Sequence, residues 1–302
     1  MTISGRAEEK KHEAARGIRF VCRAGDFLGC PAGQATRTGA EGGPALWVVR
    51  SGDAAVNLFG RMAVGNDTQW LTPTIAGAFD ASDVLWLENP RGDGDRGNQL
   101  IGRLGFSEGY SVLDTIDESD RNRVIHLLER AGMSADALEG RKAWLANLFL
   151  SQLIDRMNNV SGSSFPDTIL RRRAEMHGKS VFSEWRDIGE LIEYSVGLQE
   201  SIQLQMLGKA LDDSDSYGAR LGAWSRGDLE ALSRIAETTA IEYPDAHREV
   251  NVERNMRWVA RIRTMLADDH TEFVAIGIGH LVGPDNLLDQ LRAGGLDVQR
   301  VN

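Results

Sequence analysis

The fold of this chain is constrained most strongly by short apolar runs that are typical of β-strands. These runs lie between much longer segments with helical periodicity. Two runs flank a Gly-containing turn at 51–53, which predicts an antiparallel hairpin over residues 46–59. The other strand-like runs stand singly, at 83–88, 180–184, 273–277 and 296–301. Strands scattered through a mainly helical chain predict an α/β (α+β) fold, with a mixed central β-sheet flanked by helices.

Helical periodicity is most continuous between the second and third groups of strands. Val124, Leu128 and Leu153 belong to this pattern, which predicts a helical insertion subdomain over about residues 109–160. Residues 1–43 mix charged residues with Gly, Ala and Thr, and we expect a flexible N-terminal extension there. Residues 44–302 are then predicted to form a single domain.

Charge and hydropathy argue against several classes of partner. The 302 residues carry a net charge of −10, which repels phosphate backbones, so no nucleic-acid partner is expected. The longest apolar stretch, 273–283, is too short to cross a bilayer and contains His280, so no membrane span is predicted. The charged beginning of the chain lacks the apolar core of a secretory signal. We therefore expect a cytoplasmic protein, or an envelope protein if a leader has been trimmed, and nothing in the sequence specifies an oligomer.

Three predicted strands end on or just before a residue with catalytic chemistry. Glu88 and Glu184 close two of them, and His280 follows the third. If these strands are neighbours, two carboxylates and an imidazole meet at one sheet edge, which is suited to a metal-activated water. Each residue also has a structural alternative: His280 bonded to backbone at a helix start, and each carboxylate capping a helix or paired with an arginine such as Arg254. The sequence leaves both interpretations open.

Two further motifs are weaker. The glycines of 277–283 let a backbone approach an anion, but their spacing does not match the dinucleotide-binding fingerprint. Asp213, Asp215 and Tyr217 have the spacing of a calcium loop, but Trp224 stands where a bidentate Glu is required. We predict a solvated turn around Asp213.

Taken together and in order, several segments of residues 45–302 resemble the TraB/GumN family. This family belongs to a superfamily that also holds the Tiki proteases, the erythromycin esterases and the ChaN haem-binding proteins. The segments that carry the resemblance are 45–49, 58–60, 82–88, 178–184, 223–229, 254–255 and 274–283. The resemblance implies the superfamily's fold for residues 44–302, and a hydrolytic, metal-binding site.

The resemblance also implies roles for individual residues. The family carries two Gly-x-x-His motifs and a strand-end Glu, and the second motif here is Gly277-Ile278-Gly279-His280. Glu88 and His280 are then expected to be metal ligands. The expected catalytic residues are His280, Glu88, Glu184 and Arg254, and the expected substrate-binding residues are Arg61, Asn255, Gly277 and Gly279.

The first motif is broken in this chain. It reads Gly60-Arg61-Met62-Ala63, and the methyl group of Ala63 can neither bind a metal nor move a proton. A divalent Mn, Co or Zn ion is therefore expected to bind weakly, and Arg61 would repel a cation or hold an anionic substrate. Two hypotheses remain: a hydrolase that acts on a peptide or ester bond, and a noncatalytic protein that binds a peptide or small molecule in the same cleft.

Overall fold

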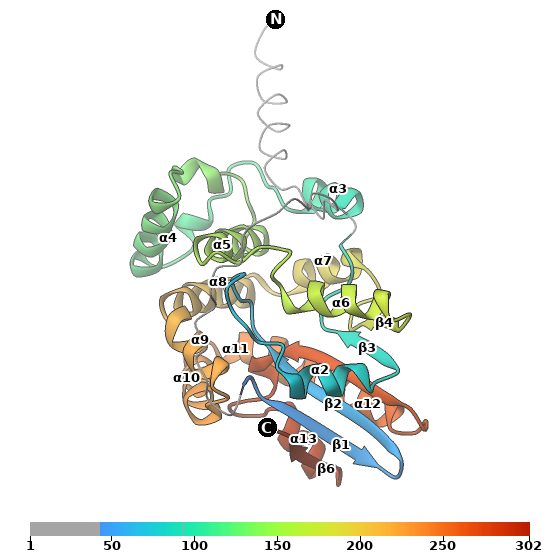
Figure 1. Ribbon diagram of the computed structural model, residues 1–302. Helices are drawn as coiled ribbons and strands as arrows, with labels where there is room; N and C mark the ends of the chain where they lie inside the picture. Colours follow the sequence, from blue (N-terminus) through green and yellow to red (C-terminus); the bar gives the residue numbers. More distant parts are fainter. Residues whose placement is uncertain (1–42, 93) are drawn as a thin grey trace, which may run out of the picture.

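A computed structural model describes residues 43–92 and 94–302 (Figure 1). The predicted flexible extension therefore lies outside the described residues, apart from Gly43. The helices are α2 (Pro73–Asp80), α3 (Gly94–Leu104), α4 (Glu118–Arg130), α5 (Ala143–Met157), α6 (Pro166–Met176), α7 (Ile188–Gly197), α8 (Glu200–Asp215), α9 (Tyr217–Ser225), α10 (Leu229–Glu242), α11 (Pro244–Ala246), α12 (Glu253–Met265) and α13 (Leu287–Ala293). Short turns of 3₁₀-helix are η1 (Val112–Asp114), η2 (Ala135–Leu138) and η4 (Ile278–His280), and η3 (His247–Val252) is a π-helix.

Six strands form one mixed sheet, as the sequence predicts. They are β1 (Leu46–Ser51), β2 (Ala54–Arg61), β3 (Val84–Leu87), β4 (Ser180–Ser183), β5 (Thr271–Gly277) and β6 (Asp297–Arg300). Their order is β4-β3-β5-β2-β1-β6. The four strands from β4 to β2 are parallel, and β1 is antiparallel to both β2 and β6. The predicted α/β fold and the predicted hairpin of β1 and β2 are thus confirmed.

The main apolar core lies against this sheet. Leu58 and Phe273, from neighbouring strands, are fully buried. Phe79 of α2 packs edge-on against Phe273, with ring centroids 5.4 Å apart. Trp258 and Ile262 of α12 belong to the same cluster, so this helix is held on the sheet by its apolar face. That anchoring fixes where the polar residues at the start of α12 lie.

A second apolar core lies in the helical part of the molecule, which Figure 1 shows above the sheet. Leu128 of α4, Leu150 of α5 and Leu207 of α8 are almost completely buried in it. The predicted insertion of 109–160 contains α4 and α5. The third helix of this core, α8, lies outside that range. A helical core forms from helices whose apolar faces meet in space, and these helices need not be neighbours in the sequence.

The structure corrects one local prediction, the turn around Asp213. The predicted turn around Asp213 is wrong: α8 continues to Asp215 and α9 begins at Tyr217. Asp213 supports the helix there, since its carboxylate pairs with Lys209 one turn earlier and with Arg220.

Among the described residues, no helix is long and apolar enough to cross a membrane.

Candidate functional site

The ends of four parallel strands bring the predicted site residues to one edge of the sheet. β3 lies between β4 and β5, and Leu87 is in register with Ser183 and Ala275. Glu88 and Glu184 therefore leave the sheet side by side. On the other side of β5, Arg61 of β2 is in register with Gly277. The carboxyl edge of a parallel sheet is where ligands commonly bind in such folds.

Glu88 is the centre of this cluster and accepts hydrogen bonds from three donors. Its Oε2 accepts from the Gly277 amide at 2.8 Å and from Arg61 Nη2 at 2.9 Å. Its Oε1 accepts from Arg254 Nη2 at 2.8 Å. Burial by itself would raise the pKa of Glu88, but the charges of Arg61 and Arg254 hold this pKa well below its usual value. The carboxylate is therefore ionised and already neutralised by protein groups.

Arg254 joins the two strand-end carboxylates. It extends from the second residue of α12, donates to Glu88, and donates through Nε to Glu184 Oε1 at 2.9 Å. Glu184 also accepts from the indole of Trp258 at 3.1 Å. The alternative in which the carboxylates pair with Arg254 is thus what the structure shows, and it applies to both of them at once.

Arg61 has a second partner, which the sequence analysis did not identify. Asp167 in the first turn of α6 lies 2.7 Å from Arg61 Nε. Burial raises the pKa of Asp167, and the nearby Arg61 charge opposes that rise. In the sequence, Asp167 follows Pro166 at a helix start, where an acidic residue commonly interacts with the helix dipole. Only its contact with Arg61 in the structure shows that Asp167 belongs to the strand-end cluster.

His280 is held as a neutral imidazole. Its Nδ1 lies 2.8 Å from Asn255 Oδ1, and the Asn255 amide nitrogen donates to the Asp285 carbonyl. Asn255 therefore presents an acceptor, so Nδ1 carries the proton and Nε2 has the free lone pair. Nε2 faces Glu88 Oε1 at 3.6 Å. Burial lowers the pKa of His280 below its usual value. The histidine is bonded to a side-chain amide, and the predicted backbone partner is not its partner.

The donor set does not fit a divalent cation well. Of the predicted ligands, Glu88 and His280 do meet, but two guanidinium groups occupy the Glu88 oxygens. Ala63 offers no side-chain donor, and its carbonyl accepts from Tyr217 at 3.3 Å. Within 43–92 and 94–302, no three His, Cys, Asp or Glu side chains are grouped so that they could hold a metal. The metal-ligand roles stay predictions that this arrangement does not favour.

The two glycines predicted to bind substrate have other partners. The Gly277 amide donates to Glu88, and a side chain at this position would lie 3.1 Å from Glu88 Oε2. The Gly279 carbonyl accepts from Asn251 at 3.2 Å. Their predicted roles in substrate binding stay predictions.

A model of the TraB/PrgY/gumN family matches residues 45–300. The chain belongs to the TraB/PrgY/gumN family. The family match confirms the resemblance over most of the chain. No curated protein and no solved structure matches the chain.

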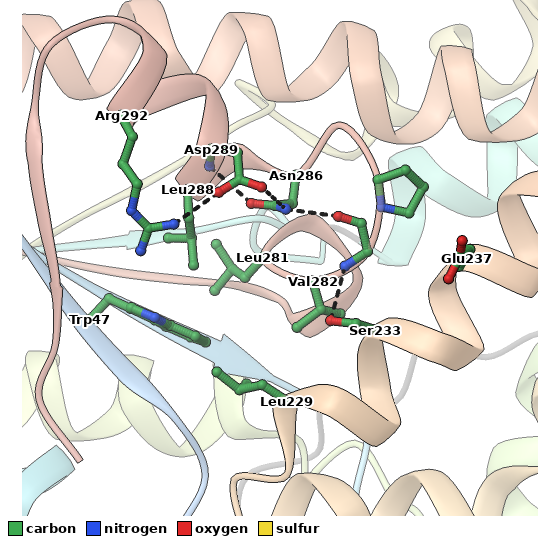
Figure 2. A pocket seen from close by; sticks show the side chains of 12 residues that line it. Trp47, Leu229, Ser233, Glu237, Leu281, Val282, Asn286, Leu288, Asp289 and Arg292 are labelled. Atoms are coloured by element: carbon green, nitrogen blue, oxygen red, sulfur yellow. Dashed lines mark hydrogen bonds and ion pairs between the residues drawn. The ribbon is translucent and has the colours of Figure 1, made fainter.

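A cavity of about 460 Å³ lies away from the strand-end cluster, between α10 and α13 (Figure 2). None of the predicted site residues lines it. Its polar groups bond mainly to one another: Asn286 donates to the Gly283 carbonyl and to Asp289, and Asp289 pairs with Arg292. Because these groups satisfy one another's hydrogen-bonding capacity, they offer few free donors or acceptors to a polar ligand.

Proposed function

We propose that this member of the TraB/PrgY/gumN family is a noncatalytic protein that binds a peptide or small molecule. One observation carries the proposal: Arg61 donates to Glu88 at 2.9 Å beside a broken first motif that ends in Ala63. A permanently charged guanidinium stands beside the carboxylate that would otherwise attract a metal. The strand-end network then works as a rigid frame.

A second candidate is hydrolysis of a peptide or ester bond without a metal. The observation in its favour is the neutral His280, whose Nδ1 is fixed by Asn255. A neutral imidazole with a free Nε2 can accept a proton from water or a hydroxyl group. Against this candidate, Nε2 faces Glu88 and the His280 side chain is only 5% exposed.

Metal titration tests the first proposal. We expect the purified protein to contain substoichiometric metal, and calorimetric titration with Mn, Co or Zn to show no saturable binding. The Ala63→His variant adds the missing ligand type, and combining it with Arg61→Met also removes one of the two guanidinium groups that bond to Glu88. Only the double variant is expected to gain measurable affinity. Stoichiometric metal in the unaltered protein that is lost in His280→Ala would contradict the proposal.

Hydrolysis assays separate the second candidate from the first. Peptide and ester substrates are offered to the unaltered protein, to His280→Ala and to the control His270→Ala, whose side chain is 64% exposed. A noncatalytic protein gives equal, background rates in all three. A rate lost only in His280→Ala would overturn the first proposal, and it should rise with pH through a pKa below the ordinary histidine value.

A further inference from the structure

A groove runs between α8 and α10 and ends beside the strand-end cluster. It consists of two cavities, of about 200 Å³ and about 60 Å³. The residues that line both are Lys209, Asp213, Thr239, His247 and Asn251. Because the two cavities share these lining residues, they are adjacent, and we call the pair the α8–α10 groove.

The groove has an excess of positive charge in an acidic protein. Asp213 accepts from Lys209 Nζ at 2.6 Å and lies 2.7 Å from Arg220 Nη1. One carboxylate thus faces two cations. An ammonium has three donors and a guanidinium has five, so both cations retain donors beyond those directed at Asp213. Since the whole chain carries −10, this local +1 favours one negative charge on a ligand.

Two acidic groups on the surrounding elements lie close to other partners. His247 of η3 lies 3.6 Å from Asp285, whose side chain is 63% exposed. On α8, Asp212 pairs with Arg123 and accepts from the Tyr243 hydroxyl. These acidic groups already have partners, so Lys209 and Arg220 remain the anion-binding groups of the groove.

The rest of the groove is lined by apolar side chains and by polar ones such as Thr239 and Asn251. Leu232, Ile235 and Ala236 of α10 line one wall of the smaller cavity, and Ile278 and Val282 also line it. Asn147 lines the larger cavity, and its Oδ1 is buried and has no hydrogen-bond partner among the described residues, as is also true of His247 Nε2. A buried acceptor without a partner is costly, and a donor on a ligand would satisfy it.

We propose that the α8–α10 groove binds a small N-acylated amino acid or the carboxyl end of a short peptide. The carboxylate lies at Lys209 and Arg220, the amide N–H donates to Asn147, and an apolar side chain packs on α10. The proposal rests on the proposed binding function and gives it a location. Gly279, next to His280, lines the groove, so the ligand would extend towards the strand-end cluster.

The first test compares two probes on the unaltered protein by calorimetry. N-acetyl-leucine carries the carboxylate, the amide and an apolar side chain, and N-acetyl-leucinamide lacks only the negative charge. We expect the acid to bind at least about tenfold more tightly than the amide, because a charge-assisted contact is lost. Equal binding of the two probes, or no binding of the acid at millimolar concentration, overturns the proposal.

The second test locates the binding. Arg220→Met should weaken N-acetyl-leucine binding about tenfold or more. The variant keeps the Lys209–Asp213 pair, which helps it fold. Arg234→Met removes a 65%-exposed arginine of α10 whose partner is Glu230 one turn earlier, and it should leave binding within about twofold. Equal loss in both variants, or none in Arg220→Met, overturns the location.

One further arm completes the experiment. Acetyl-Ala-Ala-Leu identifies a peptide end as the ligand if it binds more tightly than N-acetyl-leucine, and an N-acylated amino acid if it binds more weakly. A negative result in these binding tests can be told apart from failure of the proposed function. The metal titration and the hydrolysis assays vary Ala63, Arg61 and His280, whereas the binding tests vary a groove residue, Arg220.

Discussion

At the scale of single residues, Arg61 decides what the strand-end cluster can do. It contacts Glu88 at 2.9 Å and Asp167 at 2.7 Å, and its side chain is only 9% exposed. Buried charges are tolerated when they are paired, and a buried carboxylate that loses its partner is strongly destabilising. Arg61 therefore stabilises the fold while it blocks a cation from Glu88.

Replacing Arg61 by methionine should lower the free energy of unfolding by about 3 kcal/mol at pH 7, since Asp167 loses its buried partner. Urea unfolding followed by circular dichroism measures the loss. The loss should shrink as the pH falls towards 5, because a buried carboxylate without a cation then takes up a proton.

The matched control is Arg91→Met. Arg91 pairs with Glu175, but its side chain is 77% exposed, so its removal should cost less than about 0.5 kcal/mol. Similar losses for Arg61→Met and Arg91→Met would show that the buried network does not stabilise the fold.

At the scale of elements, the turn after η4 holds α10 close to the strand-end cluster. Gly283 has φ of +80°, and a Cβ there would lie 2.6 Å from the Ala236 Cβ of α10. Glycine is favoured at position 283 for two reasons: the backbone is left-handed there, and Ala236 of α10 approaches too closely for a side chain. Gly295 has φ of +83° but nothing within 4 Å of an added Cβ.

Alanine at these two positions separates the two requirements. Gly295→Ala should cost about 1 kcal/mol, which is the backbone strain alone. Gly283→Ala should cost at least about 1 kcal/mol more, because α10 must move away. Thermal unfolding of the two variants side by side measures the difference. Equal costs would mean that α10 moves freely against the turn.

At the scale of the whole molecule, the two larger apolar cores of the described residues support different groups of elements. One holds the sheet with α2 and α12, and the other holds α4, α5 and α8. Since α8 and α10 also form the walls of the proposed groove, the stability of the helical core should affect the groove more than the strand-end cluster.

Leu207→Ala should test whether the cores open separately. Leu207 is fully buried in the helical core, and its truncation should cost about 3 kcal/mol. Hydrogen exchange should then increase in α4, α5 and α8 and change little in β2 and β5.

The control is Leu85→Ala, which makes the same change in the sheet core and should have the opposite pattern of exchange. Increased exchange in the sheet strands of Leu207→Ala as large as in the helices would show one cooperative unit.

Local features of the sequence were enough to predict much of the fold. The hairpin of β1 and β2 depends on alternation and a turn glycine that are adjacent in the chain, and both are visible without a structure. Glu88, Glu184 and His280 could be found for the same reason: a polar residue that ends an apolar strand is a local signal. The helical continuation through Asp213 was missed, because spacing alone suggested a loop.

The sequence by itself determined which segments are strands and that reactive side chains end three of them, since strand periodicity is a property of neighbouring residues. Only the tertiary structure decided that β3 lies between β4 and β5, and that Arg254 lies between Glu88 and Glu184. It also decided that Asp167 joins Arg61. These pairings link residues 70 or more positions apart, and packing of helices on the sheet selects them, so no local pattern could reveal them.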